Sequence, residues 1–487
     1  MTSNAIIIRL RRLTQFNRPP ASRSLSYWGR NQAQLPGFVR HCPVAMRYLH
    51  LLAPLAWEQL PPRPAQPHDQ QPALSYATLA AVCLIKLDQQ LVSMGKLRHY
   101  LGEHPELGWL VGVPVCPTSP RGRPQLKLPT QRHLTRLLRT TPNAVLQLLL
   151  DSTVDLLQTE VTALGLPFGH TIALDTKHII AWVKENNPKA YHAPGRYDKT
   201  KQPAGDRDCK LGCKRQRNQR ASAKAPPSTP AAEPVPADLL AIGEYYWGYG
   251  SGVVVTKIPG WGEVVLAELT LPFDQADVAY FFPLMRQTQL RLGFRPYFGA
   301  LDAAFDAHYV YEFFHSDQHD GFAAVPFSER GGYRRTFDDQ GLPLCQAGLP
   351  MPLKYTFWSK TTLIHHQRGR HVCPLLFPEP TGSACPINHK QWPKGGCTST
   401  MPTSIGARLR YQLDRDSDRY KQVYNQRTAS ERINAQAKAL GIERPKLRNQ
   451  QAITNLNTLI YTLINLRALH RIRQRKAQLR AEGQLPA

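Results

Sequence analysis

The first half of the chain shows helical periodicity. Between residues 75 and 165, apolar side chains recur every three or four positions, which predicts a series of amphipathic helices. Pro142 and Asn143 come just before the last of these apolar stripes, which continues to Val161. We therefore expect an all-α domain over residues 75–168. Either DNA binding or a packing role would suit such a domain.

The pattern changes at His170. Apolar, β-branched runs at residues 171–174, 245–257, 263–271, 296–301 and 322–326 predict strands, and residues 277–292 and 308–314 predict helices between them. Pro259 and Gly260 divide two of the runs, as in a hairpin. This alternation indicates the first part of an α/β core over residues 169–327. A basic and then Pro/Ala/Ser-rich insertion interrupts it at residues 214–237.

The remaining segments differ from this core. Residues 328–402 are rich in Gly, Pro, Cys and aromatic residues, which predicts a β/loop insertion subdomain with short strands such as residues 354–358. Residues 403–487 return to a helical pattern that would complete the core and end in a basic tail. Residues 1–74 are read as a basic arm with a short helical piece and a Pro-rich linker. Since no acid precedes Glu58, a basic arm, disorder and a targeting segment all stay open.

The net charge of the chain indicates which class of molecule it binds. The 487 residues include 61 Lys and Arg against 35 Asp and Glu, a formal net charge of +26. Such an excess favours a polyanion, nucleic acid before an acidic membrane surface. Apolar runs are too short to cross a bilayer, so no membrane is expected as partner. Nine scattered cysteines favour a reducing compartment, and we expect a cytoplasmic, nucleoid-associated protein.

Three carboxylates stand out by their context. Asp175 and Asp302 each follow an apolar strand, and Glu431 lies in a helical segment. Residues at the ends of adjacent strands can converge, and a helix can add a third acid. Three hard oxygen ligands suit two Mg²⁺ or Mn²⁺ ions, which serve phosphodiester chemistry.

The helix around Glu431 carries a second pattern. At about 100° per residue, Tyr424, Arg427, Glu431 and Lys438 fall within roughly 60° of one another, on one face. A Tyr, an Arg and a Lys beside a metal-binding Glu can grip phosphates next to the reacting bond. The alternative is a solvated face with an Arg–Glu pair four residues apart.

The spacing Tyr-x2-Arg-x3-Glu-x6-Lys, with the two upstream aspartates, resembles the signature of insertion-sequence DDE transposases. The resemblance covers residues 170–470 and implies an α/β fold. That fold would be an RNase H-like core with a β-rich insertion, preceded by an all-α domain and followed by C-terminal helices. Asp306 lies four residues after Asp302 and is the less favoured candidate for the second of the two aspartates. We expect it to be an N-cap or a residue that makes local hydrogen bonds.

By this resemblance the chain would catalyse metal-dependent strand cleavage and strand transfer in cut-and-paste transposition. Asp175, Asp302 and Glu431 would hold two Mg²⁺ (or Mn²⁺) ions, while the other motif residues, Tyr424, Arg427 and Lys438, would contact phosphates. Its partners would be double-stranded DNA, both the terminal inverted repeats and the target, with a dimer in the synaptic complex. The alternatives are a catalytically silent, transposase-derived DNA-binding protein and a non-mobile nuclease.

Two further patterns concern the second half of the chain. Cys345, Cys373, Cys385 and Cys397 lie in the insertion and could hold structural zinc, but tight C-x2-C pairs are missing, so free thiols are favoured. Residues 444–481 contain no acid, and their apolar positions predict a helix that packs on the core or on a second subunit while its basic end meets DNA. The alternative is a solvated basic tail.

Overall fold

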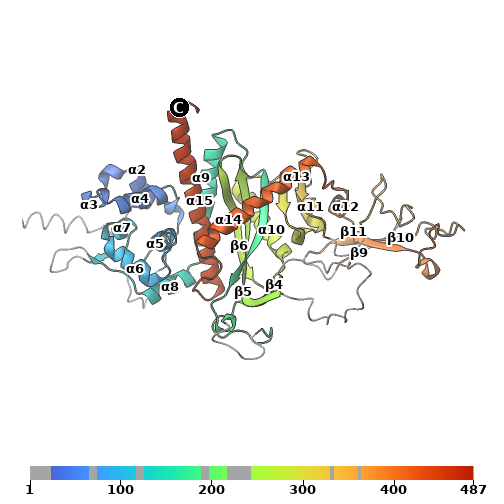
Figure 1. Cartoon of the computed structure of the whole chain (residues 1–487), viewed down its shortest axis with the longest axis horizontal. Coiled ribbons are helices and arrows are strands. Elements are labelled where there is room, and N and C mark those ends of the chain that lie inside the picture. Colours follow the sequence, from blue (N-terminus) through green and yellow to red (C-terminus); the bar gives the residue numbers. More distant parts are fainter. Residues whose placement is uncertain are drawn as a thin grey trace, which may run out of the picture.

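The molecule is elongated, with a helical part at one end, a sheet in the middle and a β-rich insertion at the other end (Figure 1). The computed structural model describes residues 23–64, 74–116, 125–187, 197–215, 243–328, 334–359 and 364–485. The first 22 residues of the expected arm and most of the insertion predicted at 214–237 lie outside these ranges.

The helical part begins well before the boundary predicted at residue 75. Its elements are α2 (Leu25–Arg30), α3 (Gly37–Arg40), α4 (Pro43–Leu52), α5 (Tyr76–Asp88), α6 (Met94–Glu103), α7 (Pro105–Leu110), the strands β1 (Val115–Cys116) and β2 (Gln125–Leu126), and α8 (Gln131–Thr140). Trp28, Tyr48 and Trp57 are buried in the same core as α5. The expected arm and linker therefore include a folded segment, because these large apolar side chains supply enough area to bury.

The central sheet is mixed. Its strands are β3 (Thr171–Ile180), β4 (Lys210–Arg215), β5 (Gly243–Ile258), β6 (Gly262–Pro272), β7 (Phe298–Leu301) and β8 (Phe322–Ala324). The strand order is β4-β5-β3-β7-β8, with β6 paired to β5. Strand β5 runs antiparallel to β3, β4 and β6, whereas β7 is parallel to β3 and β8 is parallel to β7. The predicted hairpin is confirmed as β5–β6, and the chain is a mixed α/β protein.

One predicted strand is longer than expected. The apolar run at residues 171–174 was expected to end at Asp175, but β3 continues to Ile180 because β5 pairs with it as far as Ile180 and Gly248. Asp175 is therefore a mid-strand residue. Only the parallel pairing with β7 stops at Leu174 and Leu301.

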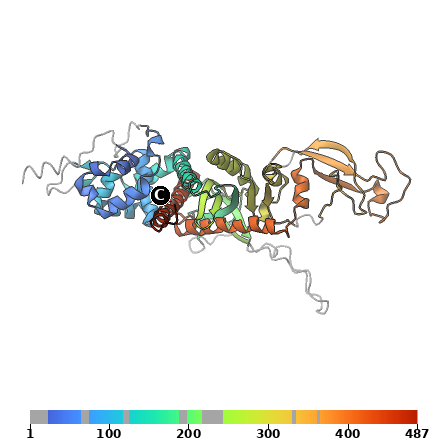
Figure 2. The same cartoon turned by 90° about the horizontal axis from the view of Figure 1, so that it is seen from above.

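Helices cover both faces of the sheet (Figure 2). They are α9 (Asn143–Thr162), α10 (Phe281–Leu292), α11 (His308–Phe314), α14 (Thr428–Ala439) and α15 (Gln450–Ala481). Helix α9, predicted as part of the helical domain, packs along α15 and against α10. Helix α15 is fixed on β6 by Asn465, which accepts from the Val265 N–H and donates to the Val265 carbonyl, each at 2.8 Å. The predicted packing of this helix on the core is confirmed.

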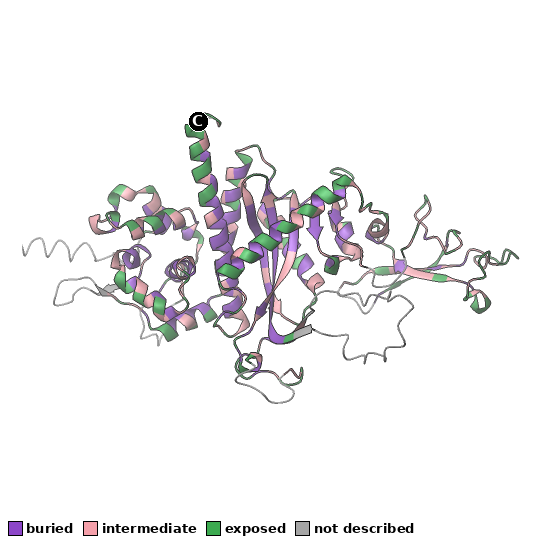
Figure 3. Ribbon diagram, viewed as in Figure 1, coloured by how far each residue is buried: buried purple, intermediate pink, exposed green. Residues whose placement is uncertain are grey.

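The insertion subdomain has little core. Strands β9 (Leu353–Trp358), β10 (Gln367–Val372) and β11 (Thr398–Pro402) form an antiparallel sheet in the order β11-β10-β9. Every residue of β9 is exposed, in contrast to the buried central sheet (Figure 3). Helices α12 (Gly406–Gln412) and α13 (Asp418–Tyr424) lead back to the core. Among the described residues, no helix is long and apolar enough to span a bilayer.

Candidate active site

Asp175 and Asp302 lie side by side on adjacent strands. Leu174 of β3 pairs with Leu301 of β7 in the parallel ladder, and each aspartate is the next residue along its strand direction. Leu174 and Leu301 are fully buried, so the pleat places the two aspartates on the opposite side. The structure thus brings together two of the three predicted acids.

Asp175 is held by two hydrogen bonds. The Thr176 backbone N–H donates to its Oδ1 at 2.9 Å, and the side-chain amide of Asn434 donates to its Oδ2 at 3.0 Å. Burial raises its pKa to about 6, the Thr176 N–H opposes that rise, and the nearby negative charge of Asp302 adds to it. A carboxyl group in this setting would be stabilised by a cation.

Asp302 caps the short 3₁₀-helix η6 (Ala303–Phe305). The Ala304 N–H donates to its Oδ1 at 2.8 Å. Burial raises the pKa of Asp302, and the charge of Asp277 raises it further. Its position is therefore set by both the end of β7 and the turn that follows.

Asp277 is an acid that the sequence pattern did not single out. It begins η5 (Asp277–Tyr280), and its Oδ1 accepts a hydrogen bond from Thr176 Oγ1 at 2.7 Å. Its charge contributes to the raised pKa values of both Asp175 and Asp302. Read from the sequence it was only the first residue of an amphipathic helix, because its proximity to Thr176 depends on how β6 returns to the sheet.

Asp306 has a structural role. Its carboxylate accepts from Arg410 Nε at 2.7 Å and Nη2 at 2.6 Å, from Tyr311 Oη at 2.8 Å and from the Ser328 N–H at 2.7 Å. The side chain is almost completely buried in this network. This agrees with the expectation of a local hydrogen-bonding residue rather than a second acid.

The Tyr-Arg-Glu-Lys motif does not lie on one continuous α-helix. Tyr424 ends α13, Arg427 ends the 3₁₀-helix η8 (Asn425–Arg427), and Glu431 and Lys438 belong to α14. The prediction of one regular helix is wrong, because the tighter η8 turn fits the chain against β3 and β7. Arg427 still reaches Glu431 as an ion pair four residues apart.

Helix α14 crosses the site next to Asp175. Asn434, which is 8% exposed, binds Asp175 and lies one turn beyond Glu431 on the same helix face. Its Oδ1 is buried and has no hydrogen-bond partner among the described residues. Arg427 acts on Asp175 electrostatically and lowers the pKa of that carboxyl. The sequence did not single out Asn434, although its spacing from Glu431 was a usable signal.

The structure engages the third acid in an ion pair with a motif arginine. The carboxylate of Glu431 binds Arg427, and its side chain is half exposed. Among the described residues, no group of three or more His, Cys, Asp or Glu is arranged to hold a metal ion. Lys438 binds Glu443 at 3.3 Å, and Glu443 also binds Lys177 at 2.6 Å. Three of the four motif residues, Arg427, Glu431 and Lys438, are therefore engaged in ion pairs in this conformation.

The insertion cysteines are only partly gathered. Burial, together with the nearby Cys373 and Cys345, raises the pKa of the Cys397 thiol to about 12. The His389 N–H donates to Cys385 Sγ at 3.5 Å, away from this group. Within the described ranges these thiols form no metal site, and structural zinc in the insertion stays a hypothesis from the sequence.

The basic C-terminal helix is partly neutralised. Arg467 binds Asp88 at 2.7 Å, and Arg473 and Lys476 both bind Glu160, at 2.8 and 2.6 Å. Basic residues of this acid-free segment therefore form ion pairs with acids of α5 and α9. Fewer of its cations are available to DNA than the sequence suggested.

Comparisons with protein-family models, with curated protein sequences and with solved structures gave no match.

Proposed function

We propose that this chain is a DDE-type DNA transposase that cuts and joins DNA at the ends of an insertion sequence. The observation that carries the proposal is the convergence of Asp175, Asp302 and the helix bearing Glu431. The two aspartates adjoin on parallel strands, and Asn434, one turn from Glu431, binds Asp175. The spacing of Tyr424, Arg427, Glu431 and Lys438 supports transposition as the reaction of this site, because it resembles the signature of DDE transposases.

The sheet supports an RNase H-like core. Strands β3, β5 and β6 form an antiparallel meander, and β7 and β8 extend it in parallel on the other side of β3. This order sets the first and second acids on neighbouring strands. The insertion with β9, β10 and β11 falls between the second acid and the glutamate, as the resemblance implies.

The donor set fits hard divalent cations. Asp175, Asp302 and Glu431 offer carboxylate oxygens, and the mutual repulsion of the two partly buried aspartates favours a bound cation. Two Mg²⁺ or Mn²⁺ ions would supply activation of a water or 3′-hydroxyl and stabilisation of the leaving oxygen. Asn434 and Thr176 orient Asp175, and Asp277 adds negative charge beside them.

The motif cations would serve the DNA. Arg427 forms an ion pair with Glu431 and also interacts electrostatically with Asp175. A DNA phosphate could take the place of Glu431 as the partner of Arg427, which would free the Glu431 carboxylate to bind metal. Tyr424 and Lys438 flank Arg427 along the same segment. The partners would be terminal inverted repeats and target DNA, bound by a dimer at the nucleoid.

A catalytically silent DNA-binding protein is the second candidate. The observation in its favour is the ion pair between Arg427 and Glu431, because it occupies the carboxylate of the third acid with a cationic side chain. The net charge of +26 serves DNA binding in either case.

Strand cleavage distinguishes the two candidates. The assay uses the DNA that flanks the coding sequence, with Mg²⁺, and compares the wild type with Glu431→Gln. The active enzyme would release new 3′-hydroxyl ends, and the variant would bind the same DNA with similar affinity without cutting it. Equal cleavage by both proteins would remove Glu431 from the site, and no cleavage by the wild type with Mg²⁺ or Mn²⁺ would favour the silent protein.

A further inference from the structure

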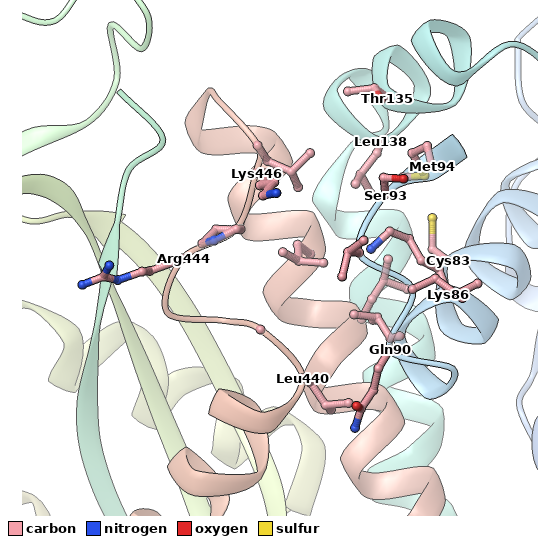
Figure 4. Close-up of a pocket in the computed structure, with 18 of the residues that line it drawn as sticks. Cys83, Lys86, Gln90, Ser93, Met94, Thr135, Leu138, Leu440, Arg444 and Lys446 are labelled. Atoms are coloured by element: carbon pink, nitrogen blue, oxygen red, sulfur yellow. The ribbon is translucent and has the colours of Figure 1, made fainter. Parts of the chain in front are cut away.

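A cavity of about 630 Å³ lies between the helical part and the segment that joins α14 to α15 (Figure 4). One wall comes from the end of α5, the start of α6 and α8. The other comes from residues 439–447 and α15. The cavity begins where the helix that carries Glu431 ends, and its lining includes none of the residues of the carboxylate site.

The interior combines apolar surface with neutral polar groups. Leu87, Leu138, Leu440 and Leu459 are among the apolar lining residues. Beside them lie the amides of Gln90 and Gln131 and the hydroxyls of Ser93 and Thr135. Such a lining suits a flat, partly apolar body with hydrogen-bonding edges.

The charged groups of the lining are all cationic. Lys86, Arg444 and Lys446 line the cavity, and none of the lining residues is an acid. Figure 4 shows Lys86 on the α5 side, with Arg444 and Lys446 on the opposite segment. Burial lowers the pKa of Lys86, and no carboxylate acts on it. A partly buried ammonium without a counterion favours an anionic ligand.

We propose that this cavity binds one nucleotide, with its phosphate against Lys86 and Lys446 and its base among the leucines, amides and hydroxyls. The Ser93 and Thr135 hydroxyls already bond to the Lys96 N–H and the Gln131 carbonyl. The edge of a base can hydrogen-bond the side-chain amides of Gln90 and Gln131, which a lipid chain cannot do. A paired base cannot enter, because its edge is covered by its complement. Trp182, 51% exposed at the rim with Arg448 stacked 4.9 Å from its ring centroid, adds an aromatic surface there.

This proposal depends on the proposed function in one respect only, that the bound nucleotide belongs to DNA. The test uses the Glu431→Gln protein without Mg²⁺, so binding is measured apart from cleavage. Fluorescence anisotropy compares a labelled duplex that has one bulged nucleotide with the same duplex fully paired. Calorimetry with dAMP and dTMP tests free nucleotides.

In the test protein, Lys86→Met should weaken binding of the bulged duplex about tenfold and leave the paired duplex unchanged. Lys96→Met, an exposed lysine on α6 outside the cavity, is the matched control and should change neither. Thr135→Trp fills the cavity but keeps every cation, and should cause the same selective loss. Thermal melts of all three variants report their folding.

Binding of dAMP or dTMP that depends on Lys86 would assign a free nucleotide, and binding of the bulged duplex alone would assign DNA. Equal affinity for bulged and paired duplexes without nucleotide binding, or tighter Lys86-dependent binding of palmitate, would overturn the proposal. If Mg²⁺-dependent cleavage is absent but the selective loss is observed, the nucleotide site stands and the transposase proposal falls.

Discussion

Asp175→Asn should stabilise the metal-free protein at neutral pH. Burial raises the pKa of Asp175 from 3.8 to about 6. As the pH rises from 3.8 to 6, the unfolded chain loses this proton before the folded protein does, so the free energy of unfolding falls. At 1.36 kcal/mol per pKa unit the loss is about 3 kcal/mol above pH 6. The amide cannot ionise, so the variant avoids this loss. One weakened hydrogen bond lowers its stability by about 1 kcal/mol, and the net increase in the free energy of unfolding is about 2 kcal/mol.

The measurement is thermal unfolding in EDTA at pH 4 and pH 7.5. The variant should melt several degrees above the wild type at pH 7.5, and the difference should vanish or reverse at pH 4. Asp306→Asn is the matched control: it breaks the buried pair with Arg410 and should lower the stability at pH 7.5 by about 3–5 kcal/mol. A variant at Asp175 that is no more stable than the wild type at pH 7.5 would refute the reasoning.

Two further predictions concern the residues around the aspartates. Asn434→Ala removes the donor to Asp175 Oδ2 and should raise the pKa of that carboxyl from about 6 by about one unit, as read by carbon NMR of the metal-free protein. Asn425→Ala, an exposed asparagine on the same segment, should leave it unchanged, and an unchanged value in both variants would exclude the positioning role. Asp277→Asn removes a negative charge and should lower the pKa of Asp302 in the same spectra, so a constant value would show that the two carboxyls do not interact.

The periodic features of the fold could be predicted from the sequence. The β5–β6 hairpin, the strand before Asp302 and the helix at His308–Phe314 follow from local apolar patterns, and the structure has all of them. The sequence predicted only a short helical piece before residue 75. It did not predict that α2, α3 and α4 form part of a folded core, because these helices are short and their burial depends on contacts with distant elements. Trp28 contacts Trp109, 81 positions later, with ring centroids 5.7 Å apart.

The candidate site could be predicted only in part. The positions of Asp175 and Asp302 follow from strands and motif spacing, but the role of Asp277 depends on a contact with Thr176 from a distant strand. Helical spacing predicts the pairing of Arg427 with Glu431, which the structure has. It could not show that the segment between Tyr424 and Glu431 passes through the η8 turn, because that turn has no distinct sequence signature.

We propose that Asp175, Asp302 and Glu431, which are far apart in the sequence, together hold two divalent cations next to a DNA phosphate. The most direct measurement is a calorimetric titration of Mn²⁺ into the protein bound to non-cleavable DNA from the flanks of the coding sequence. Two Mn²⁺ ions per chain should bind the wild type, and Asp302→Asn and Glu431→Gln should each lose at least one. Unchanged Mn²⁺ stoichiometry and affinity in both variants would contradict the account.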